Sequence, residues 1–377
     1  MLKTINIVTT ASLPWRTGTA ILALFRAYHL AQRGLDVTLY IPWIPKQQQS
    51  QLFGEDQLFD HHWEQEAYLR GQLPDFHGDN LQFVFYPARY FAALGSILPS
   101  APIAPQLCRC DWLILEEPEH LNWKHPWNRY RDRAKRVTGI VLTNYRFFIR
   151  QAVPAITLIP WLMARYNRWL MQHHCDELLL LGEGFPAMEK AQPFVSSGVP
   201  AAFFAQQKVE QLRQGVYFIG KIIWEKGFRE LVDLLCNSEV NQMDIYGLGK
   251  DQQAIRAYAK GQKITFNFKG ATLNPAEELA PYKLFINTSR SECHCSTTAE
   301  ALAHGKFVLI PDCASNESFR RFKNALLYTS AENFQIKLSH AMAHQPEEDD
   351  QLTFLSWQAA TDRLLAYHAQ RVYPDIS

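Results

Sequence analysis

The sequence predicts an α/β protein made of two domains, each built on a parallel sheet with helices on both faces. With 377 residues, the chain is long enough for two domains that each bury a core. Strand-like and helix-like segments alternate in both halves, and a polar break at residues 199–214 separates the halves. This alternation is typical of parallel sheets with right-handed crossovers, whose ligands bind at the carboxyl ends of the strands. Two such domains facing each other would enclose a cleft.

The first half opens with a β-α-β unit. Residues 5–9 are β-rich, residues 19–33 carry apolar side chains at helical spacing, Gly34 ends the helix, and residues 37–42 are extended again. Residues 47–79 are rich in Gln, His and Asp without a clear period, which indicates loops and short helices. The other segments expected in this half are strands at 81–86, 112–116 and 139–142 and a helix at 161–172.

The second half shows a longer alternating series. Its expected strands, with helical patterns between most of them, are 216–219, 243–246, 264–268, 284–287, 307–310 and 325–328. We therefore place the domains at residues 1–205 and 206–354. Neither half contains an internal repeat or a low-complexity segment.

Charge and hydropathy limit the partners that the chain can have. Lys and Arg number 38 against 37 Asp and Glu, a formal charge of +1, so the global positive field of nucleic-acid-binding proteins is absent. The N-terminus lacks the basic region and continuous apolar core of a signal peptide, and no apolar run reaches bilayer-spanning length. We expect a cytoplasmic protein that is soluble or peripheral on a membrane.

Seven cysteines make an odd number in a chain without an export signal, which indicates reduced thiols. Cys293-His294-Cys295 and the Cys108–Cys110 pair resemble metal ligands at first sight. Structural zinc sites, however, separate paired cysteines by about two to four residues and use a second pair. We therefore expect no metal.

Two glutamates flank the start of a predicted helix in the second half. Glu292 lies on the loop after the strand at 284–287, and Glu300 opens the helix. This spacing suits a nucleotide-sugar pocket, with one acid near the sugar hydroxyls, the other on the ribose, and the free N–H groups of residues 296–298 toward the diphosphate. The alternative is a T-x-x-E capping box formed by Thr297 and Glu300, with Glu292 merely solvated.

Three loops that follow predicted strands are candidates for binding a phosphate-bearing ligand. The first, residues 11–18, ends at a helix start, which favours an anion. It lacks the G-x-G-x-x-G fingerprint, and Gly18 can equally be a turn residue. Lys221 and Lys226 follow the first strand of the second half and would either neutralise a diphosphate leaving group or form a solvated surface pair. Gly247, one unit later, would admit a nucleotide close to the backbone or serve the turn.

An acidic cluster with one histidine, Glu116-Glu117-Pro118-Glu119-His120, follows a predicted strand of the first half. A histidine beside carboxylates can position or deprotonate an acceptor hydroxyl near neutral pH, which makes His120 a candidate catalytic residue. The alternative is a hydrogen-bonded loop histidine without a role in the chemistry.

Basic and aromatic residues are interleaved between Trp123 and Gln172, where Asp132 is the one acid. The cations are Lys124, Arg129, Arg131, Arg133, Lys135, Arg136, Arg146, Arg150, Arg165 and Arg168. The aromatic side chains among them include Trp123, Trp127, Tyr130, Phe147, Phe148, Trp161 and Trp169. Such a stretch suits a surface on anionic lipid headgroups. Arginines capping helices around an ordinary core are one alternative, and a single-stranded nucleic-acid site is a weaker one because the rest of the chain is not basic.

Several segments spread over nearly the whole chain carry a resemblance to a known family. They are IVTTASLPWRTGTA, ILEEPEHLNW, GIVLTNY, GKIIWEKGFRELVDLL, STTAEALAHGKFV, SNESFRRFKNALLY and LSWQAATDRLLAY. With them the sequence resembles the digalactosyldiacylglycerol synthases, retaining GT-B glycosyltransferases with an E-x₇-E signature. The resemblance implies two Rossmann-like domains facing a cleft, and metal-independent transfer of galactose from UDP-galactose to monogalactosyldiacylglycerol. The implied partners are a UDP-sugar, a galactolipid and an anionic membrane surface, with no nucleic acid.

The resemblance also assigns roles to residues. Those expected at the donor, its diphosphate or the acceptor are Gly18, Thr19, Lys221, Lys226, Gly247, Gly270, Cys295, Ser296, Thr297 and Glu300. Within this set, Glu300 would hold the ribose hydroxyls and the two lysines the diphosphate. Glu292 would contact the donor sugar and, with His120 and Lys226, make up the expected catalytic residues. The C-terminal helix, within residues 355–377, would return to pack on the first domain.

One position departs from the family pattern. In the segment GIVLTNY, Leu142 stands where the family typically has histidine, and leucine can neither accept nor donate a proton. The departure implies that His120 supplies the polar contact, that the acceptor chemistry differs, or that activity is weak. A front-face mechanism, which needs no strong base, would tolerate the leucine.

Overall fold

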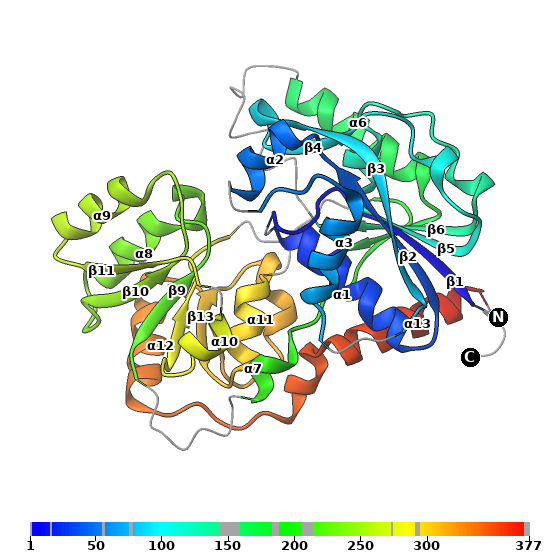
Figure 1. The fold of residues 1–377 in the computed structure, drawn as a ribbon. Coiled ribbons are helices and arrows are strands. Elements are labelled where there is room, and N and C mark those ends of the chain that lie inside the picture. The colour runs from blue at the N-terminus through cyan, green and yellow to red at the C-terminus, as the bar shows by residue number, and fades with distance from the viewer. Residues whose placement is uncertain are drawn as a thin grey trace. The chain divides into compact units, whose positions relative to one another are not determined.

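The structure of the protein is a computed structural model that consists of two compact units (Figure 1). Unit 1 comprises Met1–Leu181 and Phe185–Ser197, and unit 2 comprises Gly182–Gly184 and Gly198–Ser377. The structure describes residues 2–15, 17–54, 57–74, 78–142, 159–182, 188–205, 214–272, 274–290 and 295–372. The expected α/β class with mainly parallel sheets is confirmed. Ala205, the expected border, falls inside unit 2, and the packing of the last helix on the first domain stays a prediction.

Unit 1 contains a sheet with the strand order β4-β3-β2-β1-β5-β6-β7-β8. Its strands are β1 (Thr4–Val8), β2 (Asp36–Trp43), β3 (Leu81–Phe91), β4 (Ser96–Pro99), β5 (Cys110–Glu116), β6 (Ala134–Val141), β7 (Glu177–Leu180) and β8 (Ala191–Pro193). Its helices are α1 (Gly18–Gln32), α2 (Lys46–Phe53), α3 (His62–Gly71), α4 (Pro118–Asn122) and α6 (Ile159–His174), with 3-10 turns η1 (Ala92–Leu94), η2 (Ala104–Gln106) and η3 (Tyr130–Asp132).

All neighbouring strands of this sheet are parallel except β3 and β4. The antiparallel pairing at this edge is a feature that the sequence analysis did not predict. Only η1 and Gly95 connect the two strands, which is too short for a parallel crossover. The strand order reverses between β1 and β5, so their carboxyl ends form the topological switch point of unit 1, where α/β sheets bind ligands.

Helix α1 illustrates how the sequence sets these elements. The Thr17 hydroxyl caps its N-terminus by accepting the N–H of Ala20 at 3.2 Å. Its apolar face is buried together with one charged residue, Arg26. Gly34, with φ of +79°, follows the last turn and takes the left-handed conformation that ends many helices.

Unit 2 contains a fully parallel sheet with the order β11-β10-β9-β12-β13-β14. Its strands are β9 (Val216–Ile219), β10 (Gln242–Tyr246), β11 (Thr265–Gly270), β12 (Leu284–Ile286), β13 (Phe307–Pro311) and β14 (Ala325–Tyr328). Its helices are α7 (Ala201–Ala205), α8 (Phe228–Leu235), α9 (Gln252–Gly261), α10 (Pro275–Glu278), α11 (Ser296–Ala303), α12 (Ala331–Ala343) and α13 (Trp357–Val372), with 3-10 turns η5 (Trp224–Lys226), η6 (Ala314–Phe319) and η7 (Asp350–Leu355).

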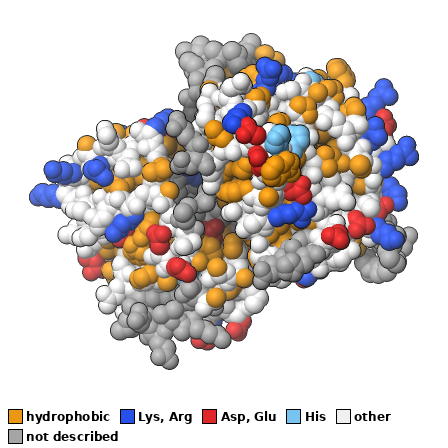
Figure 2. Space-filling view, in the orientation of Figure 1, with side chains coloured by type: hydrophobic (Ala, Val, Ile, Leu, Met, Phe, Trp, Pro, Cys, Tyr) orange, Lys and Arg blue, Asp and Glu red, His pale blue; other side chains and the backbone are white. Residues whose placement is uncertain are grey.

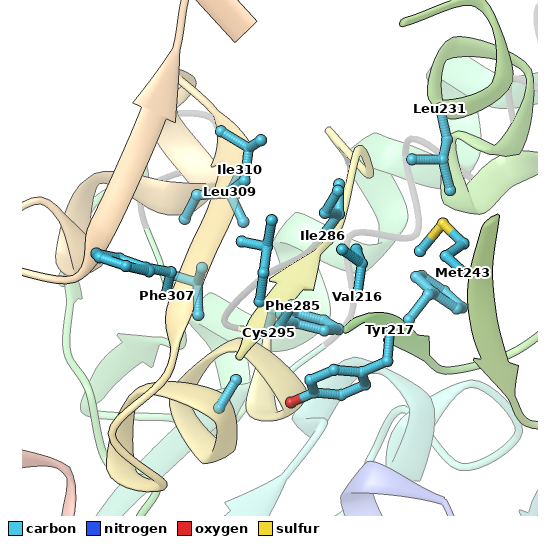
Figure 3. Packing of buried hydrophobic residues seen from close by; sticks show 14 of the residues in the cluster. Val216, Tyr217, Leu231, Met243, Phe285, Ile286, Cys295, Phe307, Leu309 and Ile310 are labelled. Carbon is cyan, nitrogen blue, oxygen red and sulfur yellow. The ribbon is translucent and has the colours of Figure 1, made fainter. Parts of the chain in front are cut away.

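The order reverses between β9 and β12, which places the switch point of unit 2 at their carboxyl ends. Right-handed crossovers put α8 and α9 on one face of the sheet and α10 and α11 on the other. The core is packed between these layers, and Figure 3 shows Phe285 and Ile286 of β12 with Val216 and Tyr217 of β9 in it.

Figure 2 shows charged side chains of both signs on one face of the molecule. On the face in Figure 2, basic and acidic side chains are interspersed, in keeping with a net charge of +1. Among the helices that the structure describes, none combines the length and the apolar character needed to cross a bilayer.

Candidate functional site

The N-terminus of α11 lies at the switch point of unit 2. Helix α11 begins at Ser296, and Cys295 is its N-cap. The buried thiol lies 3.2 Å from the Asn287 amide nitrogen and 3.2 Å from the Thr297 hydroxyl, so it ties the helix start to the end of β12. No side chain caps this helix, and the N–H groups of residues 296–298 donate to no acceptor in the described part of the chain. Such N–H groups favour an anion.

The position of the helix start corrects two expectations. Thr297 is the second residue of α11, so it cannot be the N-cap, and the T-x-x-E capping box with Glu300 is wrong. Glu300 does not open the helix but lies in its second turn, where it is half-buried. Cys295, Ser296 and Thr297 are brought together at the helix N-terminus. Glu292 lies outside the described residues.

The carboxyl group of Glu300 is held in an environment that disfavours its charge. Burial raises its pKa from the ordinary value near 4.5 to about 8. The described residues provide no cation beside it, because burial is the one cause of the shift. Near neutral pH the group is therefore protonated, and it can donate one hydrogen bond and accept another.

Replacing Glu300 by glutamine should stabilise the ligand-free protein at alkaline pH. Because the folded pKa is raised, the native state holds a proton that the unfolded state has lost, and stability falls as pH rises from about 5 to about 8. In that window the difference in the free energy of unfolding between Glu300→Gln and wild type should grow by about 1 kcal/mol for each pH unit. Thermal melts at several pH values check this. Parallel curves for the two proteins would contradict the raised pKa.

Glycines bring together the loops that follow β9, β10 and β11. The Gly220 N–H donates to the Tyr246 carbonyl at 3.0 Å, and the Gly247 N–H donates to the Gly270 carbonyl at 2.7 Å. A Cβ on Gly247, whose φ is +127°, would lie 1.9 Å from the Gly220 carbonyl oxygen, so no larger residue fits. At Gly270 a Cβ would meet no atom within 4 Å. Packing thus accounts for Gly247, and contact of either glycine with a nucleotide stays a prediction.

The two lysines follow β9, at the same switch point. Lys221 is exposed two residues after the strand, whereas Lys226 is half-buried at the end of η5. The next residue, Gly227, packs on the loop after β12, because its carbonyl accepts the Thr288 hydroxyl at 2.7 Å. This bond fixes the segment carrying Lys226 against the segment that leads to Glu292. Lys226 is therefore not part of a fully solvated lysine pair.

At the switch point of unit 1, a buried ion pair holds the end of β5. The Arg26 Nε donates to Glu116 Oε1 at 2.7 Å, and the two side chains are 1% and 0% exposed. Another Arg26 nitrogen donates to the Ser196 carbonyl. Sequence analysis missed this pair. The signal that could have found it is a single arginine on the otherwise apolar face of a helix.

The next two acids differ in their surroundings. Glu117 has φ of +56° and accepts the Thr10 hydroxyl at 3.1 Å, which ties the loop after β1 to the end of β5. Glu119 is buried, and no cation among the described residues offsets this. Burial, followed by the charge of Glu117, raises its pKa to about 8. The acidic side chains of this motif are thus buried in the protein and do not form a solvated cluster.

His120 lies in the short helix α4 and not on a loop. Its Nδ1 lies 3.5 Å from Glu117 Oε2, and its ring stacks on Trp123 with 4.6 Å between ring centroids. The side chain is buried.

Leu142, half-buried, directly follows β6 at the carboxyl edge of the same sheet. Gly18 is exposed and Thr19 half-buried in the first turn of α1, whose start follows the β1 loop.

The basic stretch is less basic in the structure than in the sequence. Three of its cations form ion pairs with carboxylates from outside the stretch. Arg131 pairs with Asp176 at 3.0 Å, Lys135 with Asp111 at 2.7 Å, and Arg136 with Glu177 at 2.8 Å. Residues 143–158, which include Arg146, Phe147, Phe148 and Arg150, lie outside the described residues. The described cations without a carboxylate partner are Lys124, Arg129, Arg133, Arg165 and Arg168.

Aromatic side chains of the same stretch are exposed. Trp127 is 75% exposed, Trp161 58% and Trp169 38%. The rings of Trp127 and Trp169 meet edge to face, 5.8 Å apart, and Arg165 lies over the Trp161 ring at 5.0 Å. Residues 161, 165 and 169 follow each other at a spacing of four, so they share one face of α6. We call Trp127, Trp161 and Trp169 the aromatic ridge.

The cysteines that had suggested a metal site are free thiols in the described chain, with Cys108 exposed and Cys110 and Cys295 buried. Among the described residues, no group of three or more His, Cys, Asp or Glu side chains is placed to hold a metal ion. Cys293 and His294 lie outside those residues.

Comparison with solved structures defines the class of fold. Sucrose-phosphate synthase from Thermosynechococcus elongatus matches with a TM-score of 0.62 over 99% of this chain and 100% of that chain, at 12% identity. Anabaena HepE in complex with UDP matches with a TM-score of 0.60 over 98% of this chain and 100% of that chain, also at 12% identity. The fold is that of the GT-B glycosyltransferases, as the sequence predicts. No protein-family model matches the chain.

Relatives by sequence define the family. Digalactosyldiacylglycerol synthase 1, chloroplastic, of Lotus japonicus is 37% identical over 383 residues, which cover 96% of this chain and 49% of that protein. Digalactosyldiacylglycerol synthase 2, chloroplastic, of Arabidopsis thaliana is 33% identical over 381 residues, which cover 96% of this chain and 80% of that protein. The chain belongs to the digalactosyldiacylglycerol synthase family. It spans about half the length of the first of these relatives.

Proposed function

We propose that the protein transfers galactose from UDP-galactose to monogalactosyldiacylglycerol, forming digalactosyldiacylglycerol with retention of configuration and without a metal ion. The observation that carries the proposal is that three of the motifs named for the family resemblance lie at the switch points of the two units. The acidic motif follows β5 in unit 1, and the lysine loop and α11 follow β9 and β12 in unit 2. These are the places where α/β sheets bind their ligands. The names of the relatives give the product, digalactosyldiacylglycerol, and the donor and acceptor are part of the proposal.

In the proposed reaction, the bond between the galactose anomeric carbon and the UDP phosphate oxygen breaks while the acceptor hydroxyl attacks from the same face. The leaving phosphate oxygen takes the acceptor proton, so no strong protein base is needed and Leu142 is compatible with the step. Lys221, Lys226 and the N–H groups at the start of α11 compensate the charge on UDP. Glu300 bonds to the ribose hydroxyls and Glu292 to the sugar.

Product analysis tests the proposal directly. Purified protein is incubated with UDP-galactose or UDP-glucose and monogalactosyldiacylglycerol in detergent, and the lipids are separated by chromatography. We expect a digalactolipid from UDP-galactose, with unchanged yield after chelation by EDTA. A different sugar or acceptor would make the protein a transferase for another glycolipid or polysaccharide. No turnover with any donor would point to a binding protein that kept the fold, a result for which Leu142 gives a reason.

The acceptor is a lipid, so the protein must reach a membrane surface, and we place this contact at the aromatic ridge. Exposed tryptophans are costly in water and suit the interface between headgroups and acyl chains. Leu162, 54% exposed, adds apolar area beside Trp161, and Arg165 and Arg168 are exposed cations on the same helix. That the protein is peripheral on a membrane is part of this proposal, which does not specify the cellular compartment.

Removing the ridge should weaken membrane binding. For Trp127→Ala with Trp161→Ala, we expect at least about tenfold weaker co-sedimentation with anionic vesicles, because two large apolar side chains no longer enter the interface. Trp63, 65% exposed on α3, is the matched control, and Trp63→Ala should bind as wild type does. Equal losses in both variants would mean that the ridge is not the contact.

A further inference from the structure

A pocket of about 500 Å³ opens in unit 1 beside the aromatic ridge. Arg109, Arg129 and Arg133 line it, together with one acid, Asp132. Three guanidinium groups and one carboxylate leave the pocket with a surplus of positive charge. Neither the acidic motif nor the loops at the switch points take part in it.

The arginines of this pocket differ from the neighbouring basic residues in that no described carboxylate forms an ion pair with them. Arg131 and Lys135, on the same stretch of chain, are neutralised by carboxylates. Arg109 and Arg129 are exposed, and in the described part of the chain neither forms an ion pair. Arg133 donates to a neutral acceptor, the Pro105 carbonyl, at 3.4 Å. Two of the cations of the basic stretch that lack a carboxylate partner, Arg129 and Arg133, therefore line the pocket together with Arg109.

The floor of the pocket is held in place by hydrogen bonds. Asn128, which lines it, is buried and donates to Asn122 Oδ1 at 2.8 Å and to the His125 carbonyl at 3.1 Å. Its own Oδ1 accepts the N–H of Ala104, a lining residue from another segment of the chain, at 3.2 Å. The two lining segments are therefore joined before any ligand binds, which lowers the entropy lost on binding.

Trp127 both lines the pocket and forms one end of the aromatic ridge. A ligand held here would place its charged group among the arginines and its apolar part along the tryptophans. Guanidinium forks pair with phosphate oxygens in two-point hydrogen bonds. We propose that this pocket binds the phosphate group of an anionic phospholipid in the membrane, an inference that rests on the proposed membrane contact at the ridge.

Vesicle binding tests the inference. Phosphatidylcholine vesicles are prepared with one of two anionic lipids, phosphatidylglycerol or cholesteryl hemisuccinate. The two preparations are matched in zeta potential, so their surface charge is the same. Of the two anionic lipids, only phosphatidylglycerol carries a phosphodiester. We expect the wild-type protein to bind the phosphatidylglycerol vesicles about fivefold to tenfold more tightly. Arg109→Gln with Arg129→Gln should lose this preference and keep the binding that the ridge provides.

Arg165→Gln with Arg168→Gln is the control, because it removes the same charge from α6 without touching the pocket. This variant should bind both kinds of vesicle more weakly and keep the preference for phosphatidylglycerol. Equal binding of the wild-type protein to both vesicles overturns the pocket inference alone. Absence of all vesicle binding overturns the membrane contact as well, while digalactolipid formation in detergent tests the transferase proposal separately.

Soluble competitors identify the source of the phosphate. Inorganic phosphate or glycerol 3-phosphate should not release the protein from the vesicles, because neither brings an apolar part to the ridge. Release by either one at low concentration would assign the pocket to a soluble phosphate compound. Tighter binding of a single-stranded oligonucleotide than of the vesicles would assign it to nucleic acid. Both results would overturn the lipid inference.

Discussion

Replacing Lys226 by alanine should lower turnover by about 10²–10³, the loss typical of removing one preorganised group that stabilises charge in a transition state. Lys226 is half-buried at the end of η5, on a segment held by the bond between Thr288 and Gly227. An ammonium group there would compensate the charge that develops on UDP as its bond to galactose breaks. Because this charge is larger in the transition state than in bound UDP-galactose, kcat should fall more than KM for UDP-galactose changes.

Two further variants make the result specific. Lys226→Arg keeps the charge and should recover part of the turnover, although its planar fork differs from an ammonium group. Lys260, exposed on α9 of the same unit, is the matched control, and Lys260→Ala should turn over as wild type does. Thermal melts show whether each variant is folded. A folded Lys226→Ala protein with wild-type kcat would remove Lys226 from the mechanism.

The parallel strands are the part of the fold that the sequence predicts best. The expected segments 216–219 and 325–328 coincide with β9 and β14. A strand buried on both faces reads as an apolar run with clear ends. Strand β8 at the sheet edge has no such run, because its three residues are half-buried or exposed. The pair β3 and β4 depends on a turn at Gly95, which the apolar pattern does not indicate.

The candidate site, like the fold, has features that the sequence predicts and features that it does not. Placing the acidic motif, the lysines and α11 at strand ends needs only the alternation of elements, and the structure has them there. The capping box is wrong because Cys295, a buried thiol tied to Asn287, is the N-cap of α11 in place of Thr297. The protonated state of Glu300 and the anchoring of Gly227 by Thr288 depend on burial and on contacts between distant segments, which no local pattern contains.

Replacing Arg26 by leucine should destabilise unit 1 by about 3–5 kcal/mol, the usual cost of leaving one member of a buried ion pair behind. Its partner Glu116 is fully buried, and burial already raises the pKa of this carboxyl even though Arg26 lowers it. Without the arginine the pKa rises further. The loss should therefore be greatest above the ordinary pKa of glutamic acid and shrink in acid, where the buried group is protonated.

Hydrogen exchange in urea, followed at the amides of β1 and β5, measures this loss in unit 1 without assuming that the two units unfold together. Arg26→Leu combined with Glu116→Leu should recover most of the stability, because an apolar pair replaces two buried charges. Arg131, half-exposed in its pair with Asp176, is the control, and Arg131→Leu should cost about 1 kcal/mol or less. If the double variant were as unstable as Arg26→Leu, the cost would come from lost packing in α1, and the ion pair would not be what holds the end of β5.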